Sequence, residues 1–217
     1  LAPTPTGLLH LGHAHTFWTA QQRSRELDGI LLYRNEDLDP ARCKPEFREA
    51  AIEDLRWFGL EWEGNPIDQS ARTKFYQTAF EQLRDSGHLF PCTCSRKDIR
   101  VAANAPHSEN GEAIYPGTCR TKDASTLTPK FSTQANWRFK VPLGEAIEFE
   151  DGRCGPQRFV AGKNFGDFPI WQKDGMPAYQ LAVVVDDAAM DITEVVRGED
   201  LLLSTARQLL LYRALEL

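Results

Sequence analysis

The twelve residues Ala2-Pro-Thr-Pro-Thr-Gly-Leu-Leu-His-Leu-Gly-His13 stand directly ahead of a stretch with helical periodicity. The two prolines restrict φ and withhold backbone donors, so we expect the segment to enter extended, while the two glycines permit a tight turn and the close approach of a ligand. A helix is predicted from about His13 to Leu27. Its first N–H groups and positive dipole end suit a phosphate, and the two histidines add donors there. The stretch therefore predicts a nucleotide-phosphate site at a helix start.

Hydrophobic periodicity predicts the elements that follow. The apolar run 30–33 is typical of a buried strand, and helices are expected from Pro45 to Gly59 and from Ala71 to Ser86. Strands that alternate with helices imply right-handed crossovers and a parallel sheet, and hence an α/β fold. The residues predicted to form the buried stripes are Phe47, Ala51, Leu55 and Phe58 in the first of these helices and Phe75, Ala79 and Leu83 in the second.

The middle of the chain differs in character. Residues 91–130 are polar, interrupted by glycine and proline, and rich in cysteine, which predicts an insert rather than part of the sheet. Beyond it, period-two alternation predicts antiparallel strands at 137–141 and 146–149, with an Asp174-Gly175 turn. We therefore expect three parts, residues 1–90, 91–130 and 131–217.

The last part contains two further predicted elements. The run Leu181–Val185 has the composition of a buried strand, and it ends in the acid pair Asp186-Asp187, which we interpret as a cap or a solvated pair rather than a magnesium site. A final helix is expected from Leu201 to Leu217. No internal repeat is visible, so the prediction is one α/β core split by an insert.

Composition excludes several classes of protein. The 217 residues carry a formal net charge of −6, which argues against a protein that holds nucleic acid by general electrostatics, so any RNA contact must be local. No apolar run approaches the roughly 18 residues of a membrane span, and no secretory leader is present, so we expect a cytoplasmic protein without a membrane partner. The five cysteines are too few and too unevenly spaced for a secreted disulfide framework.

Three of the cysteines form a metal-ligand pattern. Cys92 and Cys94 can face one metal ion from a tight turn, and Cys119 provides a third soft ligand. A closed tetrahedral site needs a fourth ligand, either His107 or Tyr115. Judged by residue type alone, His107 is the better choice, because imidazole is an ordinary zinc donor and neutral phenol a poor one. The plainer alternative is three reduced, buried thiols.

These motifs resemble those of a known family. The stretch Ala2–His13 resembles the HIGH motif of class I aminoacyl-tRNA synthetases, and its opening Ala-Pro-Thr-Pro-Thr-Gly narrows the likeness to the glutamyl branch. The spacing Cys92-x-Cys94 followed by Tyr115-x-x-x-Cys119 resembles that of glutamyl-queuosine tRNA(Asp) synthetases, and the resemblance extends over nearly the whole chain. It implies a Rossmann-type parallel sheet with an inserted zinc-binding subdomain. It also implies that Tyr115, in place of His107, completes a structural zinc site with the three cysteines.

The resemblance also assigns pocket residues. The segment Arg34-Asn35-Glu36-Asp37 is similar to the family's Arg-x-Glu-Asp, whose glutamate binds the α-ammonium group of the substrate. Arg197 is suited to hold a carboxylate in a bidentate contact, and the hydroxyl of Tyr179 to orient the substrate. Val183 stands where glutamyl-tRNA synthetases commonly have asparagine, a departure that favours the queuosine branch. The implied sites are His10 and His13 for catalysis, His10, Gly12, His13 and Asp200 for ATP, and Ala2, Thr4, Glu36, Tyr179 and Arg197 for glutamate.

The activity that the resemblance implies has two steps. Glutamate attacks the α-phosphorus of ATP, which carries magnesium, and glutamyl-adenylate and pyrophosphate result; the glutamyl group then moves to the queuosine base at the wobble position of tRNA(Asp). No activated serine or cysteine is needed, so positioning and charge stabilisation must supply the catalysis. The implied protein is a monomer. The family's arginine two positions before Ala2 and its KMSKS-type loop are absent, so we expect a sequence trimmed at both ends.

Three alternatives remain. The chain could be the catalytic half of an ordinary glutamyl-tRNA synthetase that charges the 3′ end of tRNA(Glu), although Val183 and the Tyr115-x-x-x-Cys119 spacing argue against it. A small nucleotidyltransferase could share His-x-Gly-His, but it would need neither Glu36 nor Arg197. A zinc-stapled RNA-binding module without catalysis is disfavoured by the acidic charge.

Overall fold

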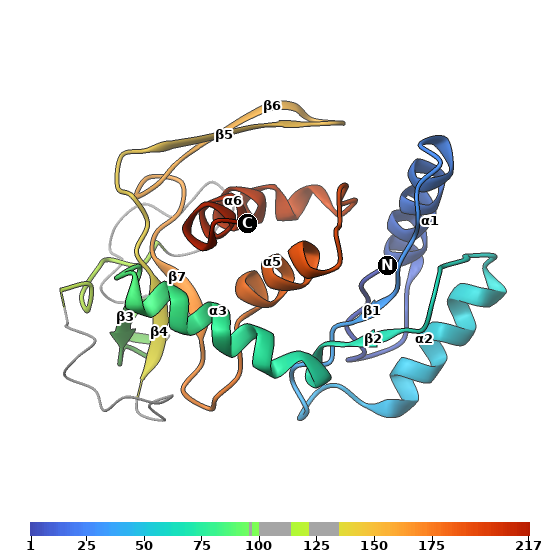
Figure 1. The fold of residues 1–217 in the computed structure, drawn as a ribbon, viewed down its shortest axis with the longest axis horizontal. Coiled ribbons are helices and arrows are strands. Elements are labelled where there is room, and N and C mark those ends of the chain that lie inside the picture. The colour runs from blue at the N-terminus through green and yellow to red at the C-terminus, as the bar shows by residue number, and fades with distance from the viewer. Residues whose placement is uncertain (96, 100–113, 122–134) are drawn as a thin grey trace. The chain divides into compact units, whose positions relative to one another are not determined.

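The computed structural model describes residues 1–95, 97–99, 114–121 and 135–217, which belong to two compact units (Figure 1). Unit 1 comprises Leu1–Lys74 and Ile192–Gly198, and unit 2 comprises Phe75–Asp191 and Glu199–Leu217. The chain therefore crosses between the units three times. The expected division at residues 90/91 and 130/131 stays a prediction, because most of the expected insert lies outside the described residues.

Unit 1 carries the parallel sheet. Its elements are α1 (Leu11–Glu26), β1 (Arg34–Asn35), α2 (Pro45–Trp57), β2 (Ile67–Asp68) and the 3-10 helix η1 (Gln69–Arg72). Strands β1 and β2 pair in parallel, with Arg34 opposite Ile67. The first residues of the chain run along the other side of β1, where the Arg34 N–H donates to the Leu1 carbonyl at 2.7 Å and the Glu36 N–H to the Pro3 carbonyl at 3.0 Å. The predicted α/β architecture with a parallel sheet is confirmed.

The core of unit 1 joins both helices to this sheet. Phe17 of α1 and Leu55 of α2 are buried in one cluster with Tyr33 and Leu60. Burial of each such side chain contributes about 2 kcal/mol. The amide of Gln21 adds a polar link, because it donates to the Gly59 carbonyl at 3.1 Å and accepts from the Glu61 N–H at 2.7 Å. The helix that begins at the nucleotide-type turn is thus fixed to the loop after α2.

Unit 2 is built on an antiparallel sheet. Helix α3 (Thr73–Asp85) leads into β3 (Leu89–Cys92), which pairs with β4 (Asn136–Phe139), and β4 pairs with β7 (Phe168–Trp171). The strands β5 (Ala146–Asp151) and β6 (Gly155–Val160) form a separate antiparallel hairpin. The C-terminal elements are α5 (Tyr179–Ala189), the 3-10 helix η3 (Glu199–Leu201) and α6 (Leu202–Leu215).

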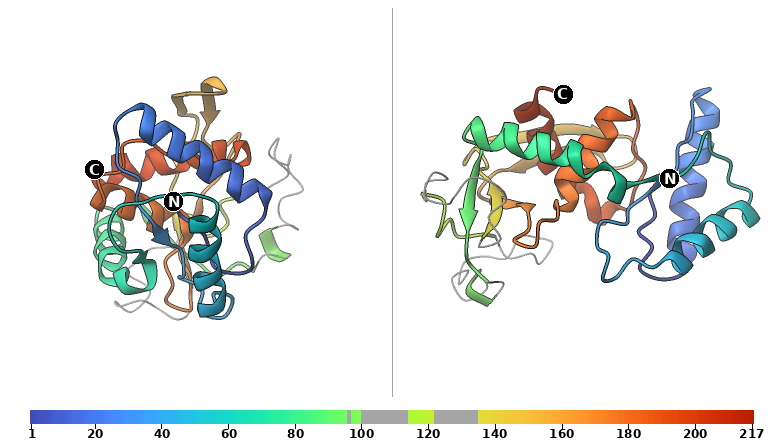
Figure 2. Two further views of the ribbon diagram at one scale, coloured as in Figure 1. Left: turned by 90° about the vertical axis from the view of Figure 1, so that its right-hand side faces the viewer. Right: turned by 60° about the horizontal axis from the view of Figure 1, so that its bottom comes forward.

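Aromatic side chains hold unit 2 together. Phe80 of α3 lies with its ring centre 5.4 Å from that of Trp137 and 5.1 Å from that of Trp171, so the helix packs on the sheet. Helices α5 and α6 pack side by side, as Figure 2 also shows. The β5–β6 hairpin lies along α6 in Figure 1, and an ion pair between Arg213 and Glu145 ties its base to that helix.

Helix α5 corrects one prediction. Residues 181–185, expected as a strand, lie inside this helix, in which eight of eleven residues are buried. A helix buried on all sides has no amphipathic stripe, and its β-branched residues then mimic a strand in sequence. The interpretation of Asp186-Asp187 as a solvated or capping pair at a strand end is also wrong. Both are buried in α5, and the Tyr76 hydroxyl donates to the Asp186 carboxylate at 2.8 Å.

Smaller differences concern boundaries and faces. The buried stripe of α3 contains Tyr76 and Phe80, whereas Phe75, expected inside, is 52% exposed. Phe58, also expected inside, is exposed; it lies just beyond the last residue of α2, Trp57. The run 30–33 precedes β1 rather than forming it. The Asp174-Gly175 turn is confirmed by a hydrogen bond from the Gly175 N–H to the Gln172 carbonyl at 3.0 Å.

None of the helices in the described ranges is long and apolar enough to cross a membrane.

Candidate functional site

The first turn of α1 is closed by its own histidines. His10 caps the helix, and its Nδ1 accepts from the Gly12 N–H at 3.1 Å. In return, Nδ1 of His13 accepts from the His10 N–H at 3.2 Å, and the two ring centres lie 3.9 Å apart. Since Nδ1 is an acceptor in both rings, each neutral imidazole carries its proton on Nε2. The turn therefore holds two Nε2–H donors close together at a helix start.

The electrostatics of this turn suit an anion. Burial, and then the neighbouring His10, lower the pKa of His13, so this ring is neutral at pH 7. The first turn of α1 has no acidic residue, and the positive end of the helix dipole lies there. A Cβ at Gly12 would lie 3.0 Å from the His10 ring, so a larger residue at this position would crowd the capping ring. The predicted phosphate-type turn thus has a coherent geometry.

Glu36 emerges just beyond β1 with both carboxylate oxygens engaged. The Arg34 guanidinium donates to Oε1 at 3.2 Å and the Thr4 hydroxyl to Oε2 at 3.4 Å. The side chains of Arg34 and Glu36 are only 8% and 11% exposed. A carboxylate has about four acceptor positions, and an ammonium group is one of the donors that it can accept from. Arg34 was quoted in the motif without a role, and the structure gives it the contact that orients Glu36.

The residues around Glu36 anchor the loop. Asn35, fully buried, donates to the Asp68 carboxylate at 3.0 Å, and Arg48 donates to the same carboxylate at 2.9 and 3.2 Å. On the other side, the carboxylate of Asp37 accepts from the N–H and hydroxyl of Ser70 at 2.9 and 2.7 Å. Glu36 is therefore held between two fixed neighbours, although it follows a strand of only two residues.

The remaining predicted pocket residues fall in both units. Ala2 is exposed on the first segment of unit 1, and Arg197 is half-buried in the segment Ile192–Gly198 of the same unit. Tyr179 and Asp200 belong to unit 2, at the first residue of α5 and in η3, and both are exposed. Val183 is buried within α5.

An ion pair anchors the segment that carries Arg197. Within Ile192–Val196 of the described chain, Glu194 makes the side-chain hydrogen bonds to α1, accepting from Nε and Nη2 of Arg23 at 2.7 and 2.9 Å. The pair lowers the pKa of Glu194, chiefly through the hydrogen bond from Arg23. The helix that begins at the histidine turn thus also positions the Arg197 segment.

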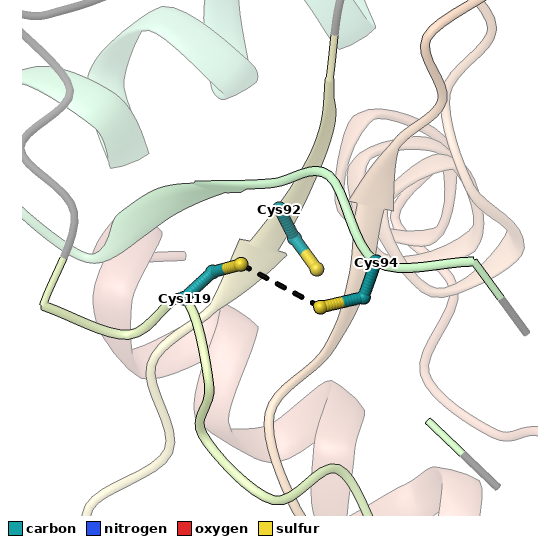
Figure 3. A group of neighbouring side chains, drawn as sticks. All are labelled: Cys92, Cys94 and Cys119. Atoms are coloured by element: carbon teal, nitrogen blue, oxygen red, sulfur yellow. Dashed lines mark hydrogen bonds between the residues drawn. The ribbon is translucent and has the colours of Figure 1, made fainter. Parts of the chain in front are cut away.

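The cysteine cluster lies in unit 2 where β3 ends. The Sγ atoms of Cys92, Cys94 and Cys119 lie within 4.8 Å of one another, and those of Cys94 and Cys119 are 3.6 Å apart (Figure 3). The Tyr115 phenol oxygen lies 3.4 Å from Sγ of Cys92 and 3.8 Å from Sγ of Cys94, and it accepts from the Cys119 N–H at 2.8 Å. The structure therefore brings four predicted ligands together.

These spacings fit one tetrahedral metal ion. With zinc–sulfur bonds of about 2.3 Å, the sulfur atoms of a tetrahedral site lie about 3.8 Å apart. Burial, and then the hydrogen bond with Cys119, raise the pKa of Cys94 to about 11, and burial raises the pKa of Tyr115 as well. A bound cation would favour the ionised, ligating form of these two groups. His107, the other candidate ligand, lies outside the described residues.

Comparisons with known proteins give the family. The family described as tRNA synthetases class I (E and Q), catalytic domain, matches residues 1–217. The glutamyl-Q tRNA(Asp) synthetase of Symbiobacterium thermophilum is 46% identical over 99% of this chain and 69% of its own length. Glutamate–tRNA ligase 2 of Nitrosococcus oceani is 40% identical over 100% of this chain and 48% of its own.

A solved structure has the same fold. The glutamate tRNA ligase from Elizabethkingia meningosepticum superposes with a TM-score of 0.81 at 26% identity, over 99% of this chain and 46% of that one. The chain thus spans about two thirds of the length of the glutamyl-Q relative and under half of the length of the two glutamate ligases. Given the match of its whole length to the family profile, the chain belongs to the class I tRNA synthetases, as a catalytic domain of the glutamyl and glutaminyl (E and Q) branch.

Proposed function

We propose that the protein activates glutamate with ATP and transfers it to the queuosine base at the wobble position of tRNA(Asp). The observation that carries the proposal is the identity of 42–46% over 99% of the chain to four relatives, each named glutamyl-Q tRNA(Asp) synthetase. It is supported by the position of the Tyr115 phenol among the three thiols, because the spacing of these four residues resembles that of the queuosine branch.

The first step is carried by positioning and charge. A carboxylate oxygen of glutamate attacks the α-phosphorus of ATP, the bond to the bridging oxygen breaks, and pyrophosphate leaves with the magnesium that the nucleotide brings. The Nε2–H groups of His10 and His13 donate to the phosphoryl oxygens as negative charge builds up on them, and Gly12 lets the phosphate approach. Such donors are typically worth about 10²–10³ in rate each.

The residues proposed for glutamate binding follow from the family resemblance. Glu36, oriented by Arg34 and Thr4, accepts the α-ammonium group of the substrate. We further propose that Arg197 holds a carboxylate and that the Tyr179 hydroxyl orients the substrate. We also propose Ala2 for glutamate binding and Asp200 for ATP binding.

A structural zinc ion is proposed for the cysteine cluster, with Cys92, Cys94, Tyr115 and Cys119 as its ligands. Their spacing fits tetrahedral coordination, and four protein ligands leave no open position for water activation. The metal would hold the segments around residues 92–94 and 115–119 together.

The test is a pair of assays on the full-length protein. We expect exchange of pyrophosphate into ATP that depends on glutamate and needs no tRNA. We also expect labelling with radioactive glutamate of tRNA(Asp) that contains queuosine, but not of queuosine-free tRNA(Asp) or of tRNA(Glu). Labelling of tRNA(Glu) alone would contradict the proposal.

A second candidate function is the charging of tRNA(Glu) by an ordinary glutamyl-tRNA synthetase. Relatives named glutamate–tRNA ligase are 38–40% identical over 99–100% of the chain. Pyrophosphate exchange that requires tRNA, together with labelling at the 3′ end of tRNA(Glu), would favour this candidate.

Two further properties complete the proposal. A ligase that acts on tRNA works where tRNA is present, so we place the protein in the cytoplasm. We also propose a monomer, which light scattering during gel filtration checks directly.

A further inference from the structure

Arg138 is a charged residue at a buried place in the sheet of unit 2. It lies in β4 between Trp137 and Phe139, and the residue is 9% exposed. A buried guanidinium is costly unless other groups compensate its charge. One compensating contact is the hydrogen bond from Nη1 to the Asp167 carbonyl at 2.9 Å.

The second contact leads to the cysteine cluster. The guanidinium carbon of Arg138 lies 4.2 Å from the ring centre of Tyr115, the phenol whose oxygen lies among the thiols. A cation over an aromatic face is attracted by the negative face of the ring, and more strongly when both are desolvated. Because Tyr115 is itself buried, a guanidinium against the face of its ring restrains the direction of the side chain and hence the position of its oxygen.

Asp167 joins the same two regions by another route. Its buried carboxylate forms an ion pair with Arg120, the residue after Cys119, and accepts from the Val141 N–H at 2.9 Å. Arg120 also donates to the Val141 carbonyl at 2.7 Å. The segment with the last thiol is therefore tied to the chain just beyond β4.

Gly166 and Asp167 together form a platform for this segment. A Cβ at Gly166 would lie 2.9 Å from Cγ2 of Ile114 and 3.0 Å from the backbone nitrogen of Tyr115. The backbone that carries the phenol thus lies directly on the glycine. The segment 114–121 is therefore held by the platform through its backbone and by Arg138 through the ring of Tyr115.

We propose that Arg138 is a positioning residue for the metal ligand Tyr115. The stacked guanidinium and the Gly166-Asp167 platform hold the phenol oxygen at the thiols, so that metal retention is coupled to docking of segment 114–121 on the sheet. The inference rests on the proposed zinc site. A residue that only filled the sheet core would affect stability but would leave the donor set of the metal unchanged.

The test follows the metal rather than the enzymatic activity. Tyr115→Phe removes only the oxygen donor, Arg138→Met removes the guanidinium but keeps an unbranched chain, and Arg138→Lys keeps the charge without the planar stack. The zinc-loaded full-length protein is mixed with a colorimetric chelator to measure the rate of zinc release. Cobalt(II) replaces zinc for visible spectra, whose d–d bands report the donor atoms.

We expect Arg138→Met to release zinc about 10–100-fold faster, the range found when partners of metal ligands are removed. Its cobalt spectrum should shift toward that of Tyr115→Phe, with a smaller shift for Arg138→Lys, and the double variant should release zinc no faster than Tyr115→Phe alone. Arg158→Met is the matched control, since Arg158 is exposed on β6 and paired with Glu148. It should behave as the unmodified protein does.

The outcomes separate the inference from the zinc proposal. If the unmodified protein retains no zinc, the metal site is wrong and the inference falls with it. If zinc is retained but Arg138→Met keeps the normal release rate and spectrum, or its effect adds fully to that of Tyr115→Phe, the role of Arg138 alone is overturned. Should Arg138→Met fail to fold, judged by far-UV circular dichroism, the spectrum and release rate of Arg138→Lys decide in the same way.

Discussion

The histidine turn of unit 1 and the cysteine cluster of unit 2 hold their functional groups by different means. The turn is made by residues 10–13, and its hydrogen bonds at 3.1 and 3.2 Å need no partner from elsewhere. The cluster collects ligands from residues 92–119, and two of its groups, Cys94 and Tyr115, have raised pKa values. The turn is therefore preorganised by short-range geometry, whereas the cluster brings together groups that are distant in sequence and, under the proposed function, would be held by a metal ion.

The largest expected effect is the loss of one cluster ligand. Cys119→Ser should lower zinc affinity by more than about 100-fold, because even changes around a metal ligand cost about 10–100-fold. Zinc content should fall from one per chain toward zero, and the melting temperature should fall by roughly 5–10 °C. Mass spectrometry of the metal and calorimetry measure the two quantities.

Cys154→Ser provides the control for this comparison. Cys154 is a free thiol at the tip of the β5–β6 hairpin, outside the cluster. Its replacement should leave both quantities unchanged. If a chelator leaves the melting temperature of the unmodified protein as it was, the cluster is as self-supporting as the turn and the contrast disappears.

The second effect concerns the turn and needs no metal. His10→Ala removes the cap and the proposed phosphate donor, so we expect the rate of pyrophosphate exchange to fall by about 10²–10³. His10→Asn separates the two roles, since asparagine caps helices well but lacks the Nε2–H group. It should keep the melting temperature while losing most of the rate, and a variant with normal exchange would remove His10 from the mechanism.

A third test asks how closely the cluster is packed against its platform. Gly166→Ala places a Cβ 2.9–3.2 Å from Ile114 and the Tyr115 backbone, so overpacking should destabilise the protein by about 1–3 kcal/mol. Gly152→Ala, where a Cβ meets nothing within 4 Å, is the matched control. Urea denaturation compares the two variants, and equal midpoints would mean that segment 114–121 adjusts without cost.

The smallest effect is expected at the Arg23–Glu194 pair. Both side chains are more than a third exposed, so Glu194→Gln should raise the KM for glutamate by only about twofold, and less in high salt. Because the folded pKa of Glu194 is lowered, its contribution is present above the ordinary pKa of 4.5 and is lost as pH falls through the lowered value. The unfolding midpoint from about pH 3 to 6, measured for the unmodified protein and for Glu194→Gln, checks this sign. Identical pH profiles for the two proteins would contradict it.

The same contrast explains what the sequence could predict. The turn at 10–13 follows from local residue types, and the cluster follows from spacing together with a resemblance that favoured Tyr115 over His107. The partners Arg34 and Arg138 were not found, since their contacts depend on which side chains the fold buries beside them. A charge between two aromatic residues of a predicted strand was the one available signal for Arg138.

The prediction of secondary structure failed where complete burial of a helix removed the hydrophobic periodicity of its sequence. Residues 181–185 have the composition of a strand but lie in α5, since a helix enclosed on all sides can be apolar at every position. In α3 the expected stripe included Phe75, but the inward position belongs to Tyr76, whose hydroxyl finds a buried carboxylate partner. Amphipathic spacing identifies a helix better than it identifies the residues at the edge of its buried face.

The three crossings between the units have a consequence for synthesis on the ribosome. Unit 1 contains the earliest residues of this chain, yet it lacks the Arg197 segment until residues 192–198 have emerged, and unit 2 lacks α6 until still later. Domains usually complete their folding in order as the chain is made. Here the core cluster of unit 1 lies within residues 17–60, whereas unit 2 lacks α6 until residues 202–215 have emerged, so a pause in translation before α6 prolongs the exposure of the core of unit 2.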